Sequence, residues 1–565
     1  MSRPAHIPER TALVVAWTAI LVGAAVRAWA VSQRGSLWLD EGALALNVLT
    51  RGLGALAHPL DWGQAAPVGF LWIERLLAAH ADVPDRWLRL VPLCAGIALP
   101  WLLWQLGRRV VGTGVGALAA VTAAGSLLAL RYSTEAKPYA SDAVVAAALL
   151  WLACEVRHLP EDLARWWALS IAAVIAAAIS IPSVFVIAAV VVALASDAAA
   201  RRAPGARRVA LPALAIAAVL FTTFWLLAYR HGASNPYLRD YWAPVMLELT
   251  ADDRVARVIR VLMELTWMPL RWTGSLLGTA AGTALWVGGV AFVARRNRSD
   301  AVLLAGPVAF AAAASVMGAY PLSDRLAFFA VPGVWVAQAA AIIAIRNEAF
   351  SGRSILANAR TAAVFVVVVA CGVAAWQYTD AQPFLRGLEA VEPTRALFAK
   401  VDDDAATVPI YVFARSAPAW LLATTRDSAW RGNARMERWT LLAGRDGAPG
   451  YENAPRAGAV AAGDGDSLIV VSGTRTELVG LAPGVQYRIA GAPSRAAPSP
   501  GWAEEEARRL LAAARPEVWL VASHFFADTP RNELRPLLEA AAAAGLRVVE
   551  ERHAGNDVVA LRLSR

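Results

Sequence analysis

Long apolar runs separated by short polar connections fill the first two-thirds of the chain, and this pattern predicts helices that cross a membrane. Runs of sufficient length lie near residues 12–30, 88–106, 113–130, 140–156, 209–229, 275–294, 301–319, 326–345 and 361–378. A longer run over 166–196 is interrupted by Ser180-Ile181-Pro182-Ser183, which predicts two short helices that meet at the break. We therefore expect a polytopic α-helical membrane protein with about eleven transmembrane helices.

Two connections on one side of the expected membrane are long and mixed in character. In the first, over 31–87, residues 43–49 and 68–78 predict short amphipathic helices that lie along the membrane surface and flank a turn rich in glycine and proline. The second, over 230–272, mixes tyrosine and tryptophan with arginine and aspartate. Its aromatic residues fit either the headgroup level of a bilayer or one wall of a lipid-facing groove.

The pattern changes to that of a soluble domain after about residue 380. Runs of strand length at 408–413, 467–472, 518–522 and 546–550 alternate with helical patterns at 502–514 and 530–544. This order predicts a small α/β domain over 381–565, attached to a transmembrane domain over 1–380. The tail contains neither a glycine-rich dinucleotide fingerprint nor a phosphate-binding P-loop, so no cofactor is expected there.

Composition and charge fix the expected orientation. With 58% hydrophobic and 17% charged residues, the chain is too apolar for a soluble multidomain enzyme. Its net charge of +9 comes largely from arginines beside the apolar runs, and no nucleic-acid-binding motif accompanies them. Because every second connection is basic, we expect a cytoplasmic N-terminus and a periplasmic or extracellular C-terminal domain. The three cysteines lie in apolar runs, so no disulfide framework is implied.

The first candidate site residues are two adjacent acids, Asp40 and Glu41, in the segment Trp-Leu-Asp-Glu-Gly at the outer membrane boundary. Ionisable groups at such a boundary suggest function. On a helix, neighbours point about 100° apart, so one acid can act as a base towards a hydroxyl while the other positions it. The alternative is a helix cap for the segment that begins at Gly42.

A second charged segment lies between two apolar runs on the same side and contains Arg131, Glu135, Lys137 and Tyr139. Lys137 is notable because the chain otherwise uses arginine, with Lys400 as its one other lysine. A compact ammonium group here can neutralise negative charge on a departing phosphate. The alternative is a lysine whose side chain extends to the membrane interface.

Two further turns on that side carry polar residues. Asp61 and Gln64 lie in a turn rich in proline and glycine, where they can hold sugar hydroxyls or serve ordinary turn chemistry. Arg325 follows Tyr-Pro-Leu-Ser-Asp at the start of an apolar run. It can bind a phosphate, or it can pair with Asp324 at the surface.

Taken together, these motifs resemble those of the C-type glycosyltransferases that use polyprenyl-phosphate sugars. This superfamily includes the protein O-mannosyltransferases, the aminoarabinose transferase of lipid A and the rhizobial lipopolysaccharide core transferases. The chain is most similar to the bacterial branch called dolichyl-phosphate-mannose-type or family 39. The matching motifs are Trp38 to Glu41, Leu60 to Pro67, Ser133 to Tyr139, and Arg325.

The resemblance implies a glycosyltransferase of the bacterial inner membrane that moves a hexosyl or pentosyl group, with inversion, from a polyprenyl-phosphate donor to a lipid, polysaccharide or protein acceptor in the cell envelope. Asp40 and Glu41 would be catalytic. Lys137, Arg325 and Arg131 would bind the donor phosphate, and Asp61, Gln64, Glu135 and Tyr139 the substrate. A bound divalent cation is not favoured, because the second loop has Glu135 and Lys137 where metal-dependent relatives have two acids.

Two other functional classes remain open on the sequence. A transporter or lipid flippase with an extracytoplasmic domain would also place charges in the membrane. Against it, the charges collect on one side, and the two halves of the spans show no internal repeat. A structural or assembly protein whose outward domain does the binding is the third possibility.

Overall fold

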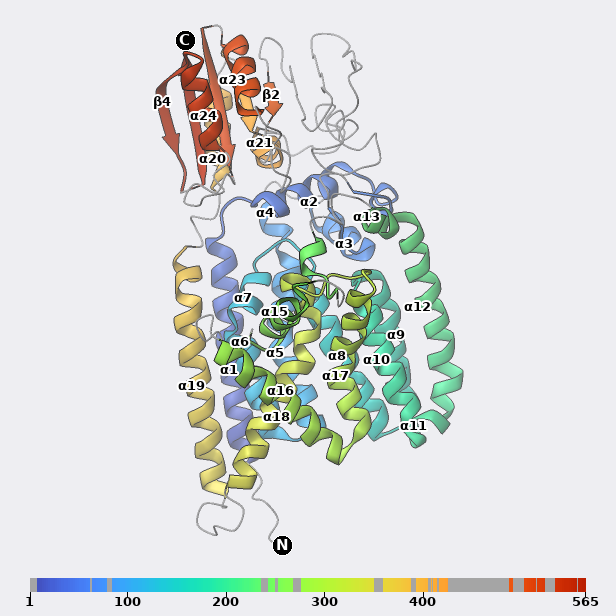
Figure 1. Cartoon of the computed structure of the whole chain (residues 1–565). Coiled ribbons are helices and arrows are strands. Elements are labelled where there is room, and N and C mark those ends of the chain that lie inside the picture. Colours follow the sequence, from blue (N-terminus) through green and yellow to red (C-terminus); the bar gives the residue numbers. More distant parts are fainter. Residues whose placement is uncertain are drawn as a thin grey trace.

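The computed structural model consists of a helical bundle with a small α/β region at one end (Figure 1). The structure describes residues 8–60, 64–78, 84–234, 242–248, 252–267, 276–349, 359–387, 393–404, 408, 410–413, 416–424, 487–490, 502–514, 516–523, 534–555 and 557–565. The N-terminal end of α1 (Glu9–Gln33) and the α/β region lie at opposite ends of the bundle.

The remaining elements of the bundle are α2 (Leu39–Thr50), η1 (Ala55–Ala57), α3 (Val68–Ala78), α4 (Pro84–Trp87), α5 (Leu90–Val110), α6 (Thr113–Gly125), α7 (Leu127–Tyr132), α8 (Tyr139–His158), α9 (Leu163–Ile179), α10 (Ser183–Ser196), α11 (Ala198–Arg202), η2 (Ala206–Ala210), α12 (Leu211–Phe224), η3 (Trp225–Tyr229), α13 (Arg230–Ser234), η4 (Ala243–Val245), α15 (Arg254–Trp267), α16 (Leu276–Arg296), α17 (Arg298–Val316), η5 (Asp324–Ala330), α18 (Val331–Ala349) and α19 (Ala359–Arg386).

Within the described residues, seven helices are long and apolar enough to cross a membrane. They span Glu9–Gln33, Asp85–Val110, Tyr139–His158, Ala206–Ala233, Arg298–Val316, Arg325–Glu348 and Arg360–Arg386. Three shorter apolar helices are α6, α9 and α10. The chain is therefore a multi-span membrane protein, as its apolar pattern predicts, whereas the number of eleven crossings stays a prediction.

Burial separates the central helices from those at the periphery. In the spans that contain α18 and α8, 83% and 72% of the most apolar 18 residues are buried. The corresponding shares for α1, α12 and α19 are 28%, 17% and 22%. In Figure 1, α12 and α19 lie at opposite edges of the bundle. Val219 and Val368, on these two outer helices, are among the large exposed apolar side chains. Such exposed apolar faces fit contact with lipid tails.

The expected break near residue 180 is confirmed, and a second break was missed. α9 ends at Ile179 and α10 begins at Ser183, whose Oγ donates to the backbone oxygen of Ser180 at 2.7 Å. The run over 113–130, expected to be one helix, is instead divided at Ser126 into α6 and α7. The Ser126 side chain caps α7 by accepting from the backbone N–H of Ala129 at 3.4 Å.

A buried arginine completes the end of α6. Arg27 of α1 is fully buried and donates to the backbone oxygens of Ala123 and Ala124, at 2.7 and 2.8 Å. These carbonyls belong to the last turn of α6, where helix carbonyls lack partners within the helix. Arg27 therefore makes it possible for α6 to end inside the bundle and for α7 to start in a new direction.

The short helices expected in the first long connection are present. α3 spans the predicted residues 68–78, and α2 contains the predicted 43–49 but begins at Leu39, so that the two acids lie in its first turn. Both helices lie at the end of the bundle that faces the α/β region (Figure 1). In the second connection, α15 is amphipathic and packs against α16 and η5.

The α/β region contains a five-stranded sheet of order β2-β1-β3-β5-β4. Its elements are α20 (Thr394–Asp404), β1 (Ile410–Phe413), α21 (Ala417–Thr424), β2 (Tyr487–Ala490), α23 (Trp502–Ala513), β3 (Glu517–Ser523), α24 (Leu534–Ala543), β4 (Arg547–His553) and β5 (Val558–Ser564). β1 is parallel to β2 and β3, whereas β5 is antiparallel to β3 and β4. β2 and β5 were not expected, and the predicted strand at 467–472 lies outside the described residues.

The α/β region packs directly on the helix that carries the two acids. α21 lies against α2, where a Cβ added at Gly42 would be 3.2 Å from Leu422 Cδ1. The backbone N–H of Arg395 donates to Ser36 Oγ at 3.1 Å, just before α2. One apolar cluster continues from the first long connection into the sheet. α19 runs through the expected boundary at residue 380, and the division into two domains stays a prediction.

Candidate active site

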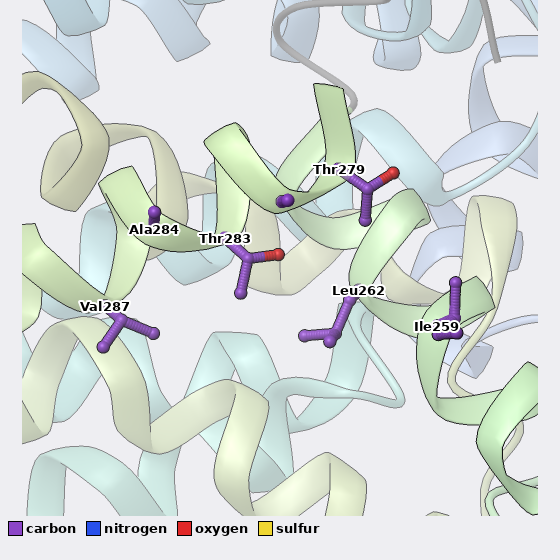
Figure 2. Close-up of a pocket in the computed structure, with 7 residues that line it drawn as sticks. Ile259, Leu262, Thr279, Thr283, Ala284 and Val287 are labelled. Atoms are coloured by element: carbon purple, nitrogen blue, oxygen red, sulfur yellow. The ribbon is translucent and has the colours of Figure 1, made fainter. Parts of the chain in front are cut away.

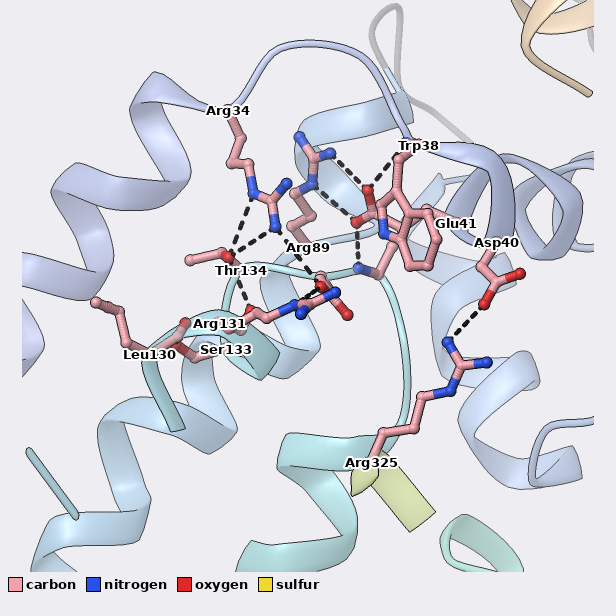
Figure 3. Close-up of polar contacts among 12 residues, drawn as sticks. Arg34, Trp38, Asp40, Glu41, Arg89, Leu130, Arg131, Ser133, Thr134 and Arg325 are labelled. Atoms are coloured by element: carbon pink, nitrogen blue, oxygen red, sulfur yellow. Dashed lines mark hydrogen bonds and ion pairs between the residues drawn. The ribbon is translucent and has the colours of Figure 1, made fainter. Parts of the chain in front are cut away.

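Asp40 and Arg325 meet where the start of α2 faces η5. Arg325 Nη1 lies 2.6 Å from Asp40 Oδ2, and the two side chains are 19% and 24% exposed (Figure 3). Arg325 lies in η5, 285 residues further along the chain than Asp40. The pair therefore holds the start of α2 against a helix that is distant in sequence. The alternative role of Asp40 as a cap of a helix that begins at Gly42 is not found, because α2 begins at Leu39 and Glu41 accepts from the backbone N–H of Trp38 at 3.2 Å.

Glu41 is fully buried and points away from Arg325, into a network of charged side chains (Figure 3). Its two oxygens accept from Arg89 at 3.1 and 2.9 Å, and Oε1 also accepts from the backbone N–H of Ala136 at 2.6 Å. Burial alone would raise the pKa of Glu41, but the nearby Arg89 and Arg34 charges and the Ala136 amide outweigh it and hold that pKa below its ordinary value. Glu41 is thus an ionised anchor for the 133–138 loop.

Glu135 and Arg131 lie in the same network. Arg131 Nε is 2.7 Å from Glu135 Oε1, and Arg34 Nη2 is 3.8 Å from the same oxygen. Burial raises the pKa of Glu135 in spite of these two cations. Arg131 is 47% exposed, whereas Glu135 is almost fully buried. Their predicted roles in phosphate and substrate binding stay predictions.

Lys137 lies on the side of the loop that faces Asp40. Its Nζ donates to Gln64 Oε1 at 2.6 Å. The charge of Asp40 raises the pKa of Lys137, and the charge of Arg325 lowers it. The guanidinium of Arg325 stacks over the Tyr139 ring at 5.7 Å. The structure therefore brings together five of the predicted residues: Asp40, Gln64, Lys137, Tyr139 and Arg325. Asp61 lies outside the described residues.

The position of the loop depends on a close approach to α5. A Cβ added at Gly96 would lie 2.2 Å from Ser133 Cβ and 3.2 Å from Arg27 Nε. Ser133 in turn donates to the backbone oxygen of Leu130 at 2.6 Å, which fixes the start of the loop. Only a residue without Cβ fits between α5 and Ser133.

We expect Gly96→Ala to displace the 133–138 loop and to reduce activity, because the new methyl group overlaps Ser133. Overpacking of this kind costs about 1–3 kcal/mol, and the thermal midpoint of the full chain should fall. Gly372→Ala is the matched control, since nothing lies within 4 Å of its added Cβ. Equal activity and equal midpoints in the two variants would contradict the role of Gly96.

The described part of the chain contains no candidate metal centre. Among the described residues, no group of three or more histidine, cysteine, aspartate or glutamate side chains is arranged to hold a metal ion. The expected independence from a divalent cation stays a prediction.

Arg34 and Arg89 were missed by the sequence analysis. Both are buried and fix the two glutamates of the network. The sequence could have identified Arg89 as a buried, paired residue, because it lies inside the apolar run expected at 88–106, where an arginine needs a partner. The sequence does not distinguish Arg34 in this way, because a basic residue at the end of a span is common.

An apolar groove lies between α15 and α16 (Figure 2). It has a volume of about 480 Å³ and is lined by Ile259, Leu262, Thr279, Ala280, Thr283, Ala284 and Val287. Val287 is 56% exposed, so the groove opens to the outside of the bundle. α15 also reaches the candidate site, because Ser323 Oγ donates to Glu264 Oε1 at 3.0 Å just before η5.

Comparison with known proteins gives one family and one fold. Residues 65–226 match the model of the family described as dolichyl-phosphate-mannose-protein mannosyltransferase. This segment contains Lys137 but neither Asp40 nor Arg325. No curated protein sequence matches the chain significantly.

Two solved structures of one protein match almost the whole chain, and a third structure matches a smaller part of it. ArnT from Cupriavidus metallidurans in the apo state has 12% sequence identity and a TM-score of 0.50, and the match covers 97% of each chain. The same protein bound to undecaprenyl phosphate matches with the same identity and coverage and a TM-score of 0.47. The oligosaccharyltransferase AglB from Archaeoglobus fulgidus, in complex with an inhibitory peptide and a dolichol-phosphate, matches with 12% identity over 72% of this chain and 63% of its own, at a TM-score of 0.37.

These findings confirm the resemblance inferred from the motifs. The family match lies in the N-terminal half of the bundle, and the match to apo ArnT extends over both the bundle and the α/β region. Residues 65–226 thus match the model of the dolichyl-phosphate-mannose-protein mannosyltransferase family, and the chain as a whole has the fold of ArnT.

Proposed function

We propose that this protein transfers a sugar, with inversion, from a polyprenyl-phosphate donor to an acceptor in the cell envelope. The observation that carries the proposal is the meeting of Asp40, Lys137 and Arg325 at one end of the bundle. One carboxylate beside two cations suits a reaction in which a hydroxyl loses a proton while a phosphate leaves.

Asp40 is the base in this proposal. Its side chain is 24% exposed, whereas Glu41 is fully buried and accepts from Arg89 and from two backbone N–H groups. A base must come within hydrogen-bond distance of the hydroxyl it activates, and only the exposed acid meets that requirement. Glu41 then acts as the orienting partner, which was one of its two predicted roles.

Lys137 and Arg325 bind the donor phosphate. Arg325 lies between Asp40 and the rings of Tyr139 and Trp242, at 5.7 and 5.8 Å from the ring centres. When a phosphate arrives, Arg325 exchanges part of its contact with Asp40 for the stronger bidentate contact with phosphate oxygens. That exchange leaves Asp40 available to the acceptor hydroxyl as the donor binds.

The apolar groove suits the lipid part of the donor. Its lining is almost entirely hydrocarbon, it opens to the outside of the bundle, and α15 connects it with the turn before Arg325. A prenyl chain in this groove would place its phosphate towards the cations. Gln64 and Tyr139, which contact Lys137 and Arg325, are then positioned to bind the sugar.

The proposed location is the bacterial inner membrane, with the N-terminus in the cytoplasm and the α/β region in the periplasm. The N-terminal end of α1 and the α/β region lie at opposite ends of the bundle (Figure 1). Arg108, Arg109 and Arg157 lie in the last turns of α5 and α8, away from the candidate site at the start of α8. Basic residues at one end support a cytoplasmic orientation for that end.

The test uses the purified full chain in lipid. Undecaprenyl phosphate carrying mannose, glucose, N-acetylglucosamine or aminoarabinose is supplied with a cell-envelope extract, with and without a chelator. We expect release of undecaprenyl phosphate and transfer of the labelled sugar from at least one donor, unaffected by the chelator. If a well-folded protein releases nothing from any donor but moves the intact lipid between leaflets, the proposal fails in favour of a flippase.

The pH dependence of Lys137 gives a second expectation. Burial lowers its pKa to about 8, although Asp40 favours the charged form. The free enzyme should therefore lose its ammonium group, and with it kcat/KM, as pH rises above about 8. The same shift makes the unfolding free energy rise between about pH 8 and 10.5, because the unfolded chain then holds the extra proton. The titration of Lys137 itself therefore does not destabilise the folded protein in this range.

The check is a profile of kcat/KM from pH 6 to 10 for the wild type and Lys137→Arg. An arginine keeps its charge throughout this range, so the alkaline limb should move up in the variant even if its maximum rate is lower. An identical limb in both proteins would assign it to another group.

A further inference from the structure

Asp142 is a buried carboxyl group that none of the contacts above uses. It lies on α8 one turn after Tyr139 and is 8% exposed. Its Oδ1 is fully enclosed and has no hydrogen-bond partner, and none of the ion pairs found among the described residues includes it. A carboxyl group removed from water without a partner is costly, so its presence requires an explanation.

The Ser180 hydroxyl lies beside this carboxyl group, and no ion pair found among the described residues gives it a cation. Ser180, at the break between α9 and α10, lies against it, and the serine hydroxyl makes no hydrogen bond of standard geometry. The carboxylate also acts electrostatically on the hydroxyls of Tyr139, Tyr229 and Tyr320. Asp142 and Ser180 therefore form a polar pair with unused hydrogen-bonding capacity inside an otherwise apolar bundle.

Asp142 lies one helical turn from the candidate active site, because Tyr139 of the same helix belongs to that site. Tyr139, one turn above Asp142, carries the stacked guanidinium of Arg325. The hydroxyl of Tyr229 accepts from the backbone N–H of Val68 at 3.0 Å, close to the segment in which Gln64 binds Lys137. One helical turn is about 5.4 Å, which is close to the span of a sugar ring between its linkage to phosphate and its far side.

We propose that Asp142, together with Ser180, binds a hydrogen-bond-donating substituent, a hydroxyl or an amino group, on the far side of the donor sugar. This inference rests on the proposed function and adds a determinant of sugar specificity to it. The phosphate is held by Lys137 and Arg325 at one end, and the sugar extends from there towards α8 and the break after α9.

A hydroxyl group and an amino group on the sugar predict different responses to substitution of Asp142. If the bound group is a neutral hydroxyl, Asp142→Asn keeps a carbonyl acceptor and retains most of the affinity for the donor. If it is an ammonium group, the asparagine loses the ionic attraction, and the variant behaves like Asp142→Ala. Both substitutions are compared on the donors named above, with KM and kcat measured separately for release of undecaprenyl phosphate.

Glu155→Gln is the matched control. Glu155 is also a buried carboxyl group on α8, but it binds Arg109, Arg165 and the indole N–H of Trp151 at the other end of the helix. We expect this control to lower the thermal midpoint and leave the donor KM unchanged. Asp142→Ala should raise the KM for the preferred donor at least tenfold, and Asp142→Asn should not lower the midpoint of the ligand-free protein, because the asparagine has nearly the same shape and keeps an oxygen that can accept from Ser180.

Each possible result either supports or overturns the proposed role of Asp142 in sugar binding. A wild type that is active while Asp142→Ala keeps the donor KM within twofold on every sugar overturns this inference alone. A midpoint that falls as far in Asp142→Asn as in Glu155→Gln overturns it too, since it assigns Asp142 a structural role. A wild type without activity on any donor overturns the proposed function and, with it, this subsite. A raised KM with an unchanged midpoint supports it.

Discussion

Asp40→Asn should abolish sugar transfer while the protein remains folded and still binds its donor. General-base catalysis typically contributes 10²–10⁴-fold to a rate, and we expect a loss of about that size in kcat. The asparagine is nearly isosteric, and its carbonyl oxygen can still accept from Arg325, which lies 2.6 Å from Asp40 in the wild type. Donor KM should therefore change much less than kcat.

Asp404→Asn is the control for the loss of an aspartate–arginine pair as such. Asp404 and Arg552 in the α/β region are also 2.6 Å apart and partly exposed, but they lie away from the candidate site. Partly exposed pairs contribute about 0–1 kcal/mol to stability, so both variants should have thermal midpoints close to the wild type. If Asp40→Asn transfers sugar within about threefold of the wild-type rate, Asp40 is not the base.

The sequence predicts the helical elements of this site better than it predicts the partners within it. The 3.6-residue pattern at 68–78 identified α3, and Ser180 with Pro182 identified the break between α9 and α10. Both features depend on local sequence. The division of the run at 113–130 was missed because its apolar pattern is continuous, and the α6 end depends on Arg27 from a distant helix.

The distinction between Asp40 and Glu41 shows why the site was only partly predictable. Adjacent residues on a helix point in different directions, and the sequence says that the two acids separate but not which one faces the substrate. That choice is made by Arg89, which is 48 residues away, and by Arg325, which is 285 residues away. Contacts of such separation follow from tertiary packing and leave no local pattern.

The network behind the site should be needed for positioning as well as for stability. Arg89→Leu leaves Glu41 buried without its cation, and breaking a buried ion pair in this way costs about 3–5 kcal/mol. It also removes the contacts from Arg89 to the backbone oxygens of Gly35 and Ser36, at 2.9 and 3.0 Å, which lead into α2. We expect a large fall in the thermal midpoint of the full chain in lipid.

The double variant Glu41→Leu with Arg89→Leu separates the two effects. Replacing a buried ion pair by apolar residues of similar volume is often neutral or stabilising, so the double variant should recover much of the midpoint that Arg89→Leu loses. It should not recover activity, because the N–H of Ala136 has then lost the Glu41 oxygen that it donates to at 2.6 Å, and Lys137 is the next residue. A double variant with wild-type kcat would mean that the packing of α2 and the 133–138 loop positions Asp40 and Lys137 without help from the ion pair.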